Sequence, residues 1–299
     1  MIDQSLKEHS PARQETDYTI LPLHIYSVYD PDGTYLIPHH WHDEWEFIYV
    51  EEGELLIHTN GYEHHAKKGE VYFINSQDIH QISSLTTISS HHAIVFDPKI
   101  IRFEWHDPCQ QKYINPLIAG KIKYLFHVND HSTAKASIIR DFKDAVTAYH
   151  GLNDSWPITV KSSLLKIIAT LINHDLLLHP VTPPKQDNEK AMTAKTAMTY
   201  IHENYTEKLT LDQLANSVNL SPQYFCKFFK STFGKTAVEY INEYRIEKAC
   251  QLLKQTDDKI IDIAFSVGFD NFSYFIRKFK SLKNMTPSTY RHSISFIRD

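Results

Sequence analysis

LANSVNLS at residues 214–221 and IAFSVGFD at residues 263–270 are two copies of one pattern. A second shared run follows each copy, YFCKFFKSTFGKT at 224–236 and YFIRKFKSLKNMT at 274–286. The copies are 49 residues apart before the turn and 50 after it, so the second turn holds one extra residue. A small alanine lets two helices cross closely, and Asn219 or Gly268 tolerates the left-handed backbone of a tight turn. Each copy therefore predicts a helix-turn-helix unit.

The ends of these helices carry suitable capping residues. Thr210 and Gln213 form a capping-box pattern, and Ser221 and Asp270 are expected to cap the second helix of each unit. Gly234 and Asn284 suit helix ends, and Thr236 and Thr286 suit the starts of the helices that follow. We expect the two units at about 210–231 and 259–281, joined by a helix at about 237–253.

From about Thr196 to Arg291 the chain resembles the AraC/XylS family of bacterial transcription regulators. The resemblance rests on IAFSVGFDNFSYF at 263–275, on Phe279-Lys280, and on MTPS and YR at 285–288 and 290–291. It implies a partner of double-stranded operator DNA, contact with RNA polymerase, and no catalytic residues. A helical repeat that only packs against itself would not explain two units with the same downstream capping residues.

Two recognition helices, at 221–231 and 271–281, are expected to enter successive major-groove segments. Gln223 and Arg277 suit base reading, whereas Lys227, Lys230, Lys278 and Lys280 suit phosphates. Phe272 either touches a thymine methyl group or packs against Phe269 and Tyr274. The predicted DNA-binding residues are Gln223, Tyr224, Cys226, Lys227, Lys230, Asn271, Phe272, Ser273, Arg277 and Lys278.

Charge and histidine divide the 299 residues into two parts. Residues 187–299 hold 16 Lys and Arg against 13 Asp and Glu, whereas residues 1–186 hold 15 against 23 and include 17 of the 19 histidines. We expect a domain at 1–180, a Pro-rich linker at 181–192 and a DNA-binding domain at 193–299. Three separated cysteines and no long apolar run or leader predict a soluble cytoplasmic protein with no membrane partner.

Short β-rich runs fill the first part, at 47–50, 55–58, 71–74 and 93–96, with turn signals at Glu52-Gly53, Asn60-Gly61 and Lys68-Gly69. They predict a sandwich or small barrel. The expected fold class is multidomain α and β: a cupin-like β-barrel with added helices, then an all-α double helix-turn-helix domain. Helices are expected from about Ser132 and from Pro157 to Leu178. The second helix has more apolar residues than one face can bury, so we expect a homodimer through Leu164, Ile168 and Leu171.

The spacing His40-x-His42-x-x-x-Glu46, followed by Gly53, Gly69 and His80, is similar to the two motifs of cupin barrels. The chain departs from them at Asn75, where Pro is usual, and at Gln77, where Gly is usual. In metal-binding cupins such positions supply three imidazoles and a carboxylate, which would suit Zn, Fe, Mn or Ni. Three interpretations remain: a divalent metal held by His40, His42, Glu46 and His80; an effector pocket without cofactor; or structural roles only. His39, His64, His65, His91 and His92 are expected to be exposed.

An effector pocket needs apolar walls with a few polar groups. We expect effector contacts from His40, His42, Glu46, Trp45, Tyr49 and His80, with Tyr72 and Phe73 nearby. Alternation puts Phe47 and Tyr49 on one strand face and Ile48 and Val50 on the other, so only one pair lines the interior. Aromatic faces favour a sugar or glycoside, and hence an activator of a carbohydrate-utilisation operon. A metal-dependent cupin enzyme, a metal-responsive regulator and an architectural DNA-binding protein are the alternatives.

Overall fold

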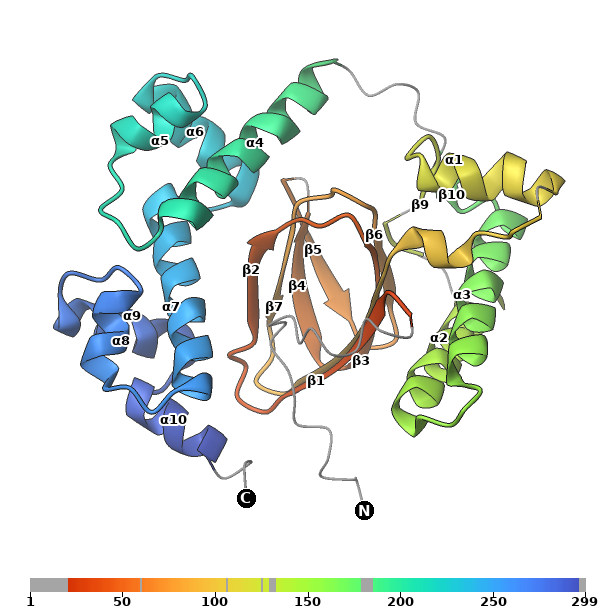
Figure 1. Ribbon diagram of the computed structural model, residues 1–299, viewed down its shortest axis with the longest axis horizontal. Helices are drawn as coiled ribbons and strands as arrows, with labels where there is room; N and C mark the ends of the chain where they lie inside the picture. Colours follow the sequence, from red (N-terminus) through yellow and green to blue (C-terminus); the bar gives the residue numbers. More distant parts are fainter. Residues whose placement is uncertain are drawn as a thin grey trace.

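The computed structural model describes residues 21–59, 61–105, 107–124, 126–128, 133–178 and 185–295. Its centre is a barrel of two antiparallel four-stranded sheets, ordered β1-β8-β3-β6 and β2-β7-β4-β5 (Figure 1). The strands are β1 Leu23–Asp30, β2 Leu36–His40, β3 Trp45–Glu52, β4 Glu54–Thr59, β5 Tyr62–Lys67, β6 Val71–Ile74, β7 His80–Ser84 and β8 Ser89–Phe96. All four β-rich runs lie within these strands, so the prediction of a barrel is confirmed.

A helical layer covers the outer face of the first sheet. It contains η1 Pro98–Ile101, η2 Gln110–Ile114, α1 Asn115–Ile118, α2 Thr133–Gly151 and α3 Trp156–Asn173, with the short pair β9 Lys123–Tyr124 and β10 Leu177–Leu178. Phe47, Phe73 and Phe96 pack against Phe142 and Leu164 in one buried core. The inner faces of the two sheets form the apolar interior of the barrel, with Ile48 and Val50 from the first sheet and Leu55, Ile57 and Ile82 from the second.

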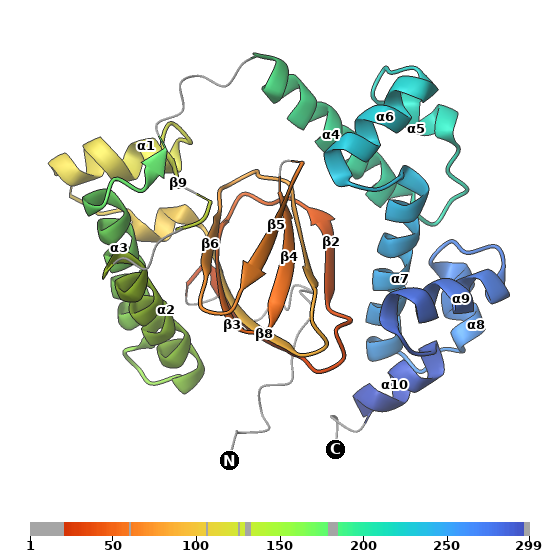
Figure 2. The same ribbon diagram turned by 180° about the vertical axis from the view of Figure 1, so that it is seen from behind.

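The remaining helices lie on the other side of the barrel, against the second sheet (Figures 1 and 2). They are α4 Lys185–Asn204, α5 Leu211–Ser217, α6 Pro222–Phe233, α7 Ala237–Gln255, α8 Ile260–Ser266, α9 Phe272–Lys283 and α10 Pro287–Ser295. Asn219 at φ 54° and Gly268 at φ 92° occupy the left-handed turns. Gly234 and Asn284 are left-handed C-caps of α6 and α9, and the Thr210 capping box is formed. Both helix-turn-helix predictions are confirmed.

Three predicted boundaries or caps are wrong. The second recognition helix is capped by Asn271, whose side chain accepts a hydrogen bond from the Tyr274 backbone N–H, and not by Asp270. Helix α3 ends at Asn173, because Asp175 takes a left-handed backbone at φ 55° and Leu177–Leu178 pairs with β9. Helix α4 begins at Lys185, inside the expected linker, because no proline follows Pro184 in that stretch. Residues 181–184 lie outside the described residues.

Within the described parts of the chain, every helix is too short or too polar to span a lipid bilayer. The three cysteines are free thiols, as expected, with Cys109 and Cys226 exposed and Cys250 buried.

Candidate functional site

One end of the barrel holds four of the residues singled out from the cupin-like spacing. His40 ends β2, His42 follows it, Glu46 lies in β3 and His80 begins β7. One potential ligand atom from each of the four lies within 4.8 Å of the others. Glu46 and His80 are buried at 3% and 0% exposure, while the other two are partly exposed, so the cluster opens towards solvent.

Backbone carbonyl groups orient the three imidazoles. The Nδ1 atoms of His40, His42 and His80 lie 3.0, 3.1 and 2.9 Å from the carbonyl oxygens of Pro38, Glu44 and Asp78. A carbonyl oxygen only accepts, so each Nδ1 donates. Each Nε2 then faces the cluster, where Glu46 Oε2 lies 3.0 Å from His80 Nε2 and 3.4 Å from His42 Nε2.

Burial and charge set the protonation of this cluster. Burial, with the neighbouring His80 and His42, lowers the pKa of His40 to about 3, so its Nε2 carries a lone pair at neutral pH. Burial opposes ionisation of Glu46, but hydrogen bonds from His42 and His80 outweigh it and hold the pKa of Glu46 well below its ordinary value. Burial disfavours the charged form of His42, yet Glu46 raises the pKa of His42 above its usual range. The cluster is a carboxylate surrounded by imidazoles.

These donors fit a divalent metal. Histidine ligands to metals commonly donate their second ring nitrogen to a carbonyl group, which fixes the tautomer and the ring plane. Three imidazole nitrogens with one carboxylate oxygen suit Zn, Fe, Ni or Mn. The same groups also suit an effector that carries hydroxyl or carboxylate oxygens, because they offer one hydrogen-bond acceptor group and several imidazole nitrogens.

The turn of the second cupin motif is preserved although Asn75 and Gln77 differ from the usual residues. Gln77 adopts the left-handed backbone, at φ 69°, which a glycine would take without strain. Asn75 is buried; its side chain accepts a hydrogen bond from the Tyr124 backbone N–H at 2.8 Å and donates to the Tyr124 carbonyl at 3.3 Å. His80 is therefore held in the strand that the motif requires.

Two predicted effector contacts are wrong. Trp45 and Tyr49 lie on the opposite face of β3 from Glu46, in the core shared with the helical layer. The ring of Trp45 meets Tyr124 at 4.8 Å, and that of Tyr49 meets Phe142 at 5.9 Å. Phe73 also lies in that core, whereas Tyr72 lies in the interior. The interior pair on β3 is Ile48 and Val50.

Two histidines expected at the surface are buried at 1% exposure each. His39 lies on the outer face of β2, against the helical domain. His91 points into the barrel beside Tyr35, with ring centroids 4.9 Å apart, and neither ring nitrogen has a hydrogen-bond partner. Burial lowers the pKa of His91 to about 4. In β8, His91 and Ala93 lie on one face and Ile94 and Phe96 on the other. Apolar residues on both faces were the sequence signal that both faces are buried.

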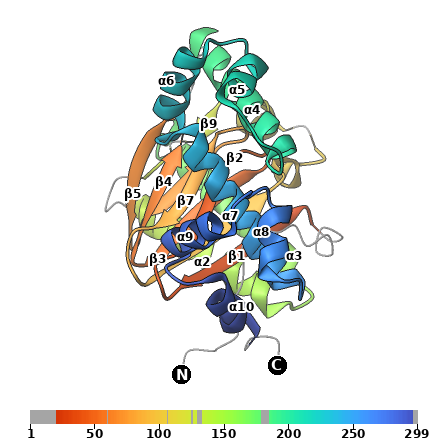
Figure 3. The same cartoon turned by 90° about the vertical axis from the view of Figure 1, so that its left-hand side faces the viewer.

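A second candidate surface lies on the recognition helices. Figure 3 shows α6 and α9 along one edge of the helical domain, with α5 and α8 along the other. On this surface the predicted residues Gln223, Tyr224, Cys226, Lys227, Lys230, Asn271, Ser273 and Arg277 are exposed, whereas Phe272 and Lys278 are partly buried.

Local contacts change the expected role of two of these residues. The side-chain carbonyl oxygen of Asn271 is used as the helix cap, which leaves its amide NH₂ for other partners. Phe272 belongs to the core of the second unit and stacks on Phe275 at 6.2 Å, so packing is its role in this structure, although its partner differs from the Phe269 and Tyr274 expected. Arg277 remains exposed, with its guanidinium 5.3 Å from the Tyr274 ring centroid.

Comparison with known proteins identifies a domain family for each of the two parts of the chain. A helix-turn-helix domain family matches residues 214–293, and a cupin domain family matches residues 27–89. An HTH-type regulator in the cgkA 5′ region of Pseudoalteromonas carrageenovora is 30% identical over 161 residues, which are 54% of this chain and 92% of that protein. The chain belongs to the AraC/XylS family of transcription regulators.

Two further relatives align with most of this AraC-type regulator. The HTH-type transcriptional regulator YdeC of Bacillus subtilis is 29% identical over 300 residues, with 97% of each chain covered. The HTH-type transcriptional activator RhaS of Pectobacterium atrosepticum is 24% identical over 266 residues, covering 88% of this chain and 90% of that one. The regulator is thus similar to full-length family members across both domains.

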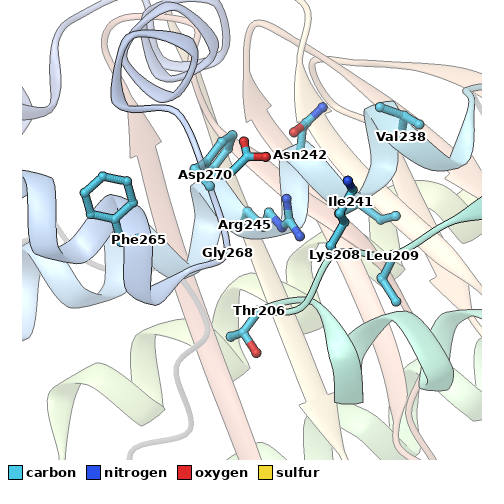
Figure 4. A pocket seen from close by; sticks show the side chains of 11 residues that line it. Thr206, Lys208, Leu209, Val238, Ile241, Asn242, Arg245, Phe265, Gly268 and Asp270 are labelled. Atoms are coloured by element: carbon cyan, nitrogen blue, oxygen red, sulfur yellow. The ribbon is translucent and has the colours of Figure 1, made fainter.

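The two helix-turn-helix units of the regulator meet at a cleft of about 300 Å³ (Figure 4). It lies between the α4–α5 loop, α7 and the α8–α9 turn, and its lining includes Thr206, Val238, Arg245, Phe265 and Gly268. A Cβ atom on Gly268 would lie 2.6 Å from the Tyr205 carbonyl oxygen, so only glycine permits this approach. Arg245 donates to the carbonyl oxygens of Tyr205 and Glu207 at 2.7 and 2.8 Å, which ties α7 to the same loop.

Proposed function

We propose that the regulator activates transcription from its operator when a small molecule occupies the barrel site formed by His40, His42, Glu46 and His80. The observation that carries this proposal is the set of three imidazoles, each oriented by a backbone carbonyl towards one buried carboxylate, in a chain that also carries two helix-turn-helix units. Such pre-oriented polar groups at the open end of an apolar barrel are typical of a ligand site. The site is proposed to bind and not to catalyse.

A sugar or glycoside remains the proposed effector class, and a carbohydrate-utilisation operon the proposed target. The support is now the oxygen-seeking character of the cluster, because Trp45 and Tyr49 lie outside the barrel interior. Sugar hydroxyl groups can donate to the Glu46 carboxylate and to the Nε2 lone pair of His40. Relatives named as activators support activation as the direction of control.

Glu46→Gln and His80→Ala test the site. We expect both variants to lose the response of promoter output to inducing sugars. An isolated 188–299 fragment, which contains neither residue, should bind DNA equally with and without the sugar. His65→Ala, on the exposed side of β5, is the matched control and should respond normally. A normal response in both site variants would show that the inward histidines only support the fold.

A bound divalent metal is the second candidate, favoured by the Nδ1 hydrogen bonds of all three histidines. His40, His42, His80 and Glu46 would hold it, and the ion would supply a positive centre for effector oxygens. The surrounding residues orient the ligands and limit solvent access from the barrel interior. Metal content after dialysis against Zn²⁺, Ni²⁺ or Mn²⁺ tests this: one ion for each wild-type and His65→Ala chain is expected, and none for His40→Ala with His80→Ala.

A homodimer and a contact with RNA polymerase complete the proposal. An activator of this kind acts by bringing polymerase to a promoter, and paired chains read longer operators than single chains. Crosslinking of the full chain to polymerase on operator DNA would test the second contact.

A further inference from the structure

In the part of the chain that the structure describes, the first helix-turn-helix unit shares a hydrophobic core with the barrel, whereas the second unit does not. Ile79 of the barrel is 5% exposed and lies in the same buried cluster as Phe233, Tyr240 and Ile241, with Trp41 packed against it. Among the described residues, the core of the second unit contains none from the barrel. A movement of this barrel wall would therefore first displace α6 and the start of α7, which pack against it.

Strand β2 presents the candidate site on one face and the DNA-binding domain on the other. The His40 ring lies in the cluster, 4.2 Å from the ring centroid of His80. Its neighbour His39 faces outward, where its ring meets Phe233 edge-on at 5.2 Å and its Nε2 lies 2.8 Å from Nδ1 of His58. The Tyr240 hydroxyl donates to the His39 carbonyl oxygen at 2.9 Å and lies 2.8 Å from His202 Nε2. A hydrogen-bonded path thus runs from α4 through α7 to β2.

Strand β7 repeats this arrangement. His80 faces the cluster, while its two neighbours face the DNA-binding domain. Gln81 accepts a hydrogen bond from Lys235 Nζ at 2.8 Å, and Lys235 also pairs with Glu243 of α7 at 2.6 Å. Next to His40, Lys195 of α4 lies over the Trp41 ring at 4.6 Å. The residues beside His40 and His80 are therefore the ones that contact the helices.

We infer that occupation of the barrel site is transmitted to α6 and α7 directly through the outer faces of β2 and β7. This inference rests on the proposed binding function of the site and adds its route of regulation. Zn–N bonds are about 2.0–2.1 Å, so two ligand atoms on one ion are at most about 4.2 Å apart. The present spread of up to 4.8 Å must contract when all four bind. Packed walls transmit such shifts because protein interiors have few voids.

The direction of the effect follows from the docked arrangement. The contacts to Phe233, Tyr240 and Lys235 are made with the ligand atoms spread apart, so contraction of the site weakens them. Release of α6 and α7 from the barrel frees the two helix-turn-helix units, as one body, to adjust to DNA. A ligand can favour that state only through its higher affinity for it, and loosened docking must in return raise ligand affinity.

The test uses the full chain, Zn²⁺ as the probe, and a DNA duplex selected from a random pool by the same chain. Tyr240→Phe removes the hydroxyl group that joins His39 to His202, and Gln81→Ala removes the acceptor for Lys235. Tyr244→Phe is the matched control, since it loses a hydroxyl group one turn along α7 that makes no hydrogen bond among the described residues. DNA affinity is measured by anisotropy with and without Zn²⁺, and Zn²⁺ affinity by calorimetry.

For the wild type and Tyr244→Phe, Zn²⁺ should raise DNA affinity by about fivefold or more. For Tyr240→Phe and Gln81→Ala, the effect of Zn²⁺ should fall below about twofold, with higher DNA affinity before Zn²⁺ is added and tighter Zn²⁺ binding. An undiminished Zn²⁺ effect in both interface variants overturns the inference, as does Zn²⁺ binding without any change in DNA affinity.

A second arm separates failure of this inference from failure of the metal site. If wild-type chain binds no Zn²⁺, DNA affinity is compared for His80→Ala, Tyr240→Phe and the double variant. Coupling through β7 and β2 predicts that the effects of the two single variants are not additive in the double variant, because residues that act through the same packed wall interact. Additive effects in this cycle would show that the site and the docking contact are independent, and the inference would be wrong.

Discussion

Arg277 is the residue on which sequence-specific DNA reading is most directly tested. Its guanidinium lies over the Tyr274 ring on the exposed side of α9, and guanidinium groups pair with guanine through two hydrogen bonds. We expect Arg277→Ala to lower affinity for the selected operator by about 1–3 kcal/mol and to relax preference at one base pair. Anisotropy titrations on operator and single-base variants measure both effects.

Lys230→Ala is the matched comparison, on the exposed face of α6. A phosphate contact specifies no base, so affinity should fall equally for operator and random DNA, and the salt slope should decrease by about 1. If Arg277→Ala also weakens both kinds of DNA equally, Arg277 contacts phosphates and does not read bases.

His91 gives a prediction about pH. It is buried with no hydrogen-bond partner, and burial lowers its pKa to about 4, against an unfolded value near 6.5. The unfolded chain therefore binds a proton before the folded chain does, and stability decreases as pH falls from about 7 towards 4. His91→Leu should remove about 2 kcal/mol of the stability lost between pH 8 and pH 5.

Urea unfolding of wild type and His91→Leu at both pH values measures this difference. His65→Leu, at an exposed position on β5, should show the wild-type pH dependence. A wild-type pH dependence in His91→Leu would mean that His91 is protonated, or paired, when folded.

Alternation along β3 was visible in the sequence, but the direction of each face was not. Glu46 shares its face with Ile48 and Val50, while Trp45 and Tyr49 share the other. Both faces are buried, one by the barrel and one by α2 and α3, so hydrophobicity alone could not assign them. The clustering of His40, His42, Glu46 and His80 was predictable because spacing, unlike hydrophobicity, is specific to the motif.

Helix α3 is the element whose surface predicts assembly. The residues first expected at the interface, Leu164, Ile168 and Leu171, are 0–1% exposed and belong to the core under the helix. The helix instead presents an open groove of about 500 Å³, lined by Ile158, Lys161, Ser162, Leu165, Lys166 and Ala169. Ile158 is 73% exposed, so this face is the one that a second copy would cover.

We expect the full chain to sediment as a dimer at micromolar concentration and Ile158→Glu with Leu165→Glu to sediment as a monomer, because two charges would then be buried at the interface. Asn173→Glu, at the exposed end of the same helix, should remain dimeric. A monomeric wild type at that concentration would exclude α3 as a stable interface.

The helix ends show what local sequence can and cannot specify. Ser221, Thr210 and Gly234 were assigned correctly because each cap depends on its own neighbours. Asn271, and not Asp270, caps α9 because the second turn has one more residue than the first. Which of the two residues becomes the cap depends on the path of the chain after Phe269, which is buried in the core. The position of β10 depends on its pairing with β9, which is distant in sequence and which a single sequence does not reveal.

At the scale of the whole molecule, the acidic barrel domain lies beside the basic DNA-binding domain. Residues 1–186 carry 15 Lys and Arg against 23 Asp and Glu, and the carboxylate of Glu63 would lie 3.6 Å from a Cβ at Gly234, at the end of α6. We therefore expect the barrel to oppose the approach of DNA. The 187–299 fragment should associate with a duplex about threefold to tenfold faster than the full chain at about 10 mM ionic strength, where screening is weak.

Stopped-flow association over a range of salt concentration measures this effect, and the two rates should converge at about 0.2 M salt. In the full chain, Glu63→Gln should recover part of the difference. Glu104→Gln changes a residue in the segment that follows η1. Because η1 contacts α3, on the side of the barrel away from the DNA-binding domain, this variant should recover less of the difference in rate. Equal rates for fragment and full chain at low salt would contradict a repulsive field from the barrel.

The contact of the Gly268 turn with the α4–α5 loop has a consequence for the promoter. This contact and the two Arg245 hydrogen bonds fix the helix-turn-helix units against each other. The two recognition helices are therefore held at a fixed separation. One base pair inserted between the two contacted segments would rotate one of them by about a tenth of a turn and move it about 3.4 Å away. The protein could not follow, so spacing between the segments is as much a part of the operator as the bases themselves.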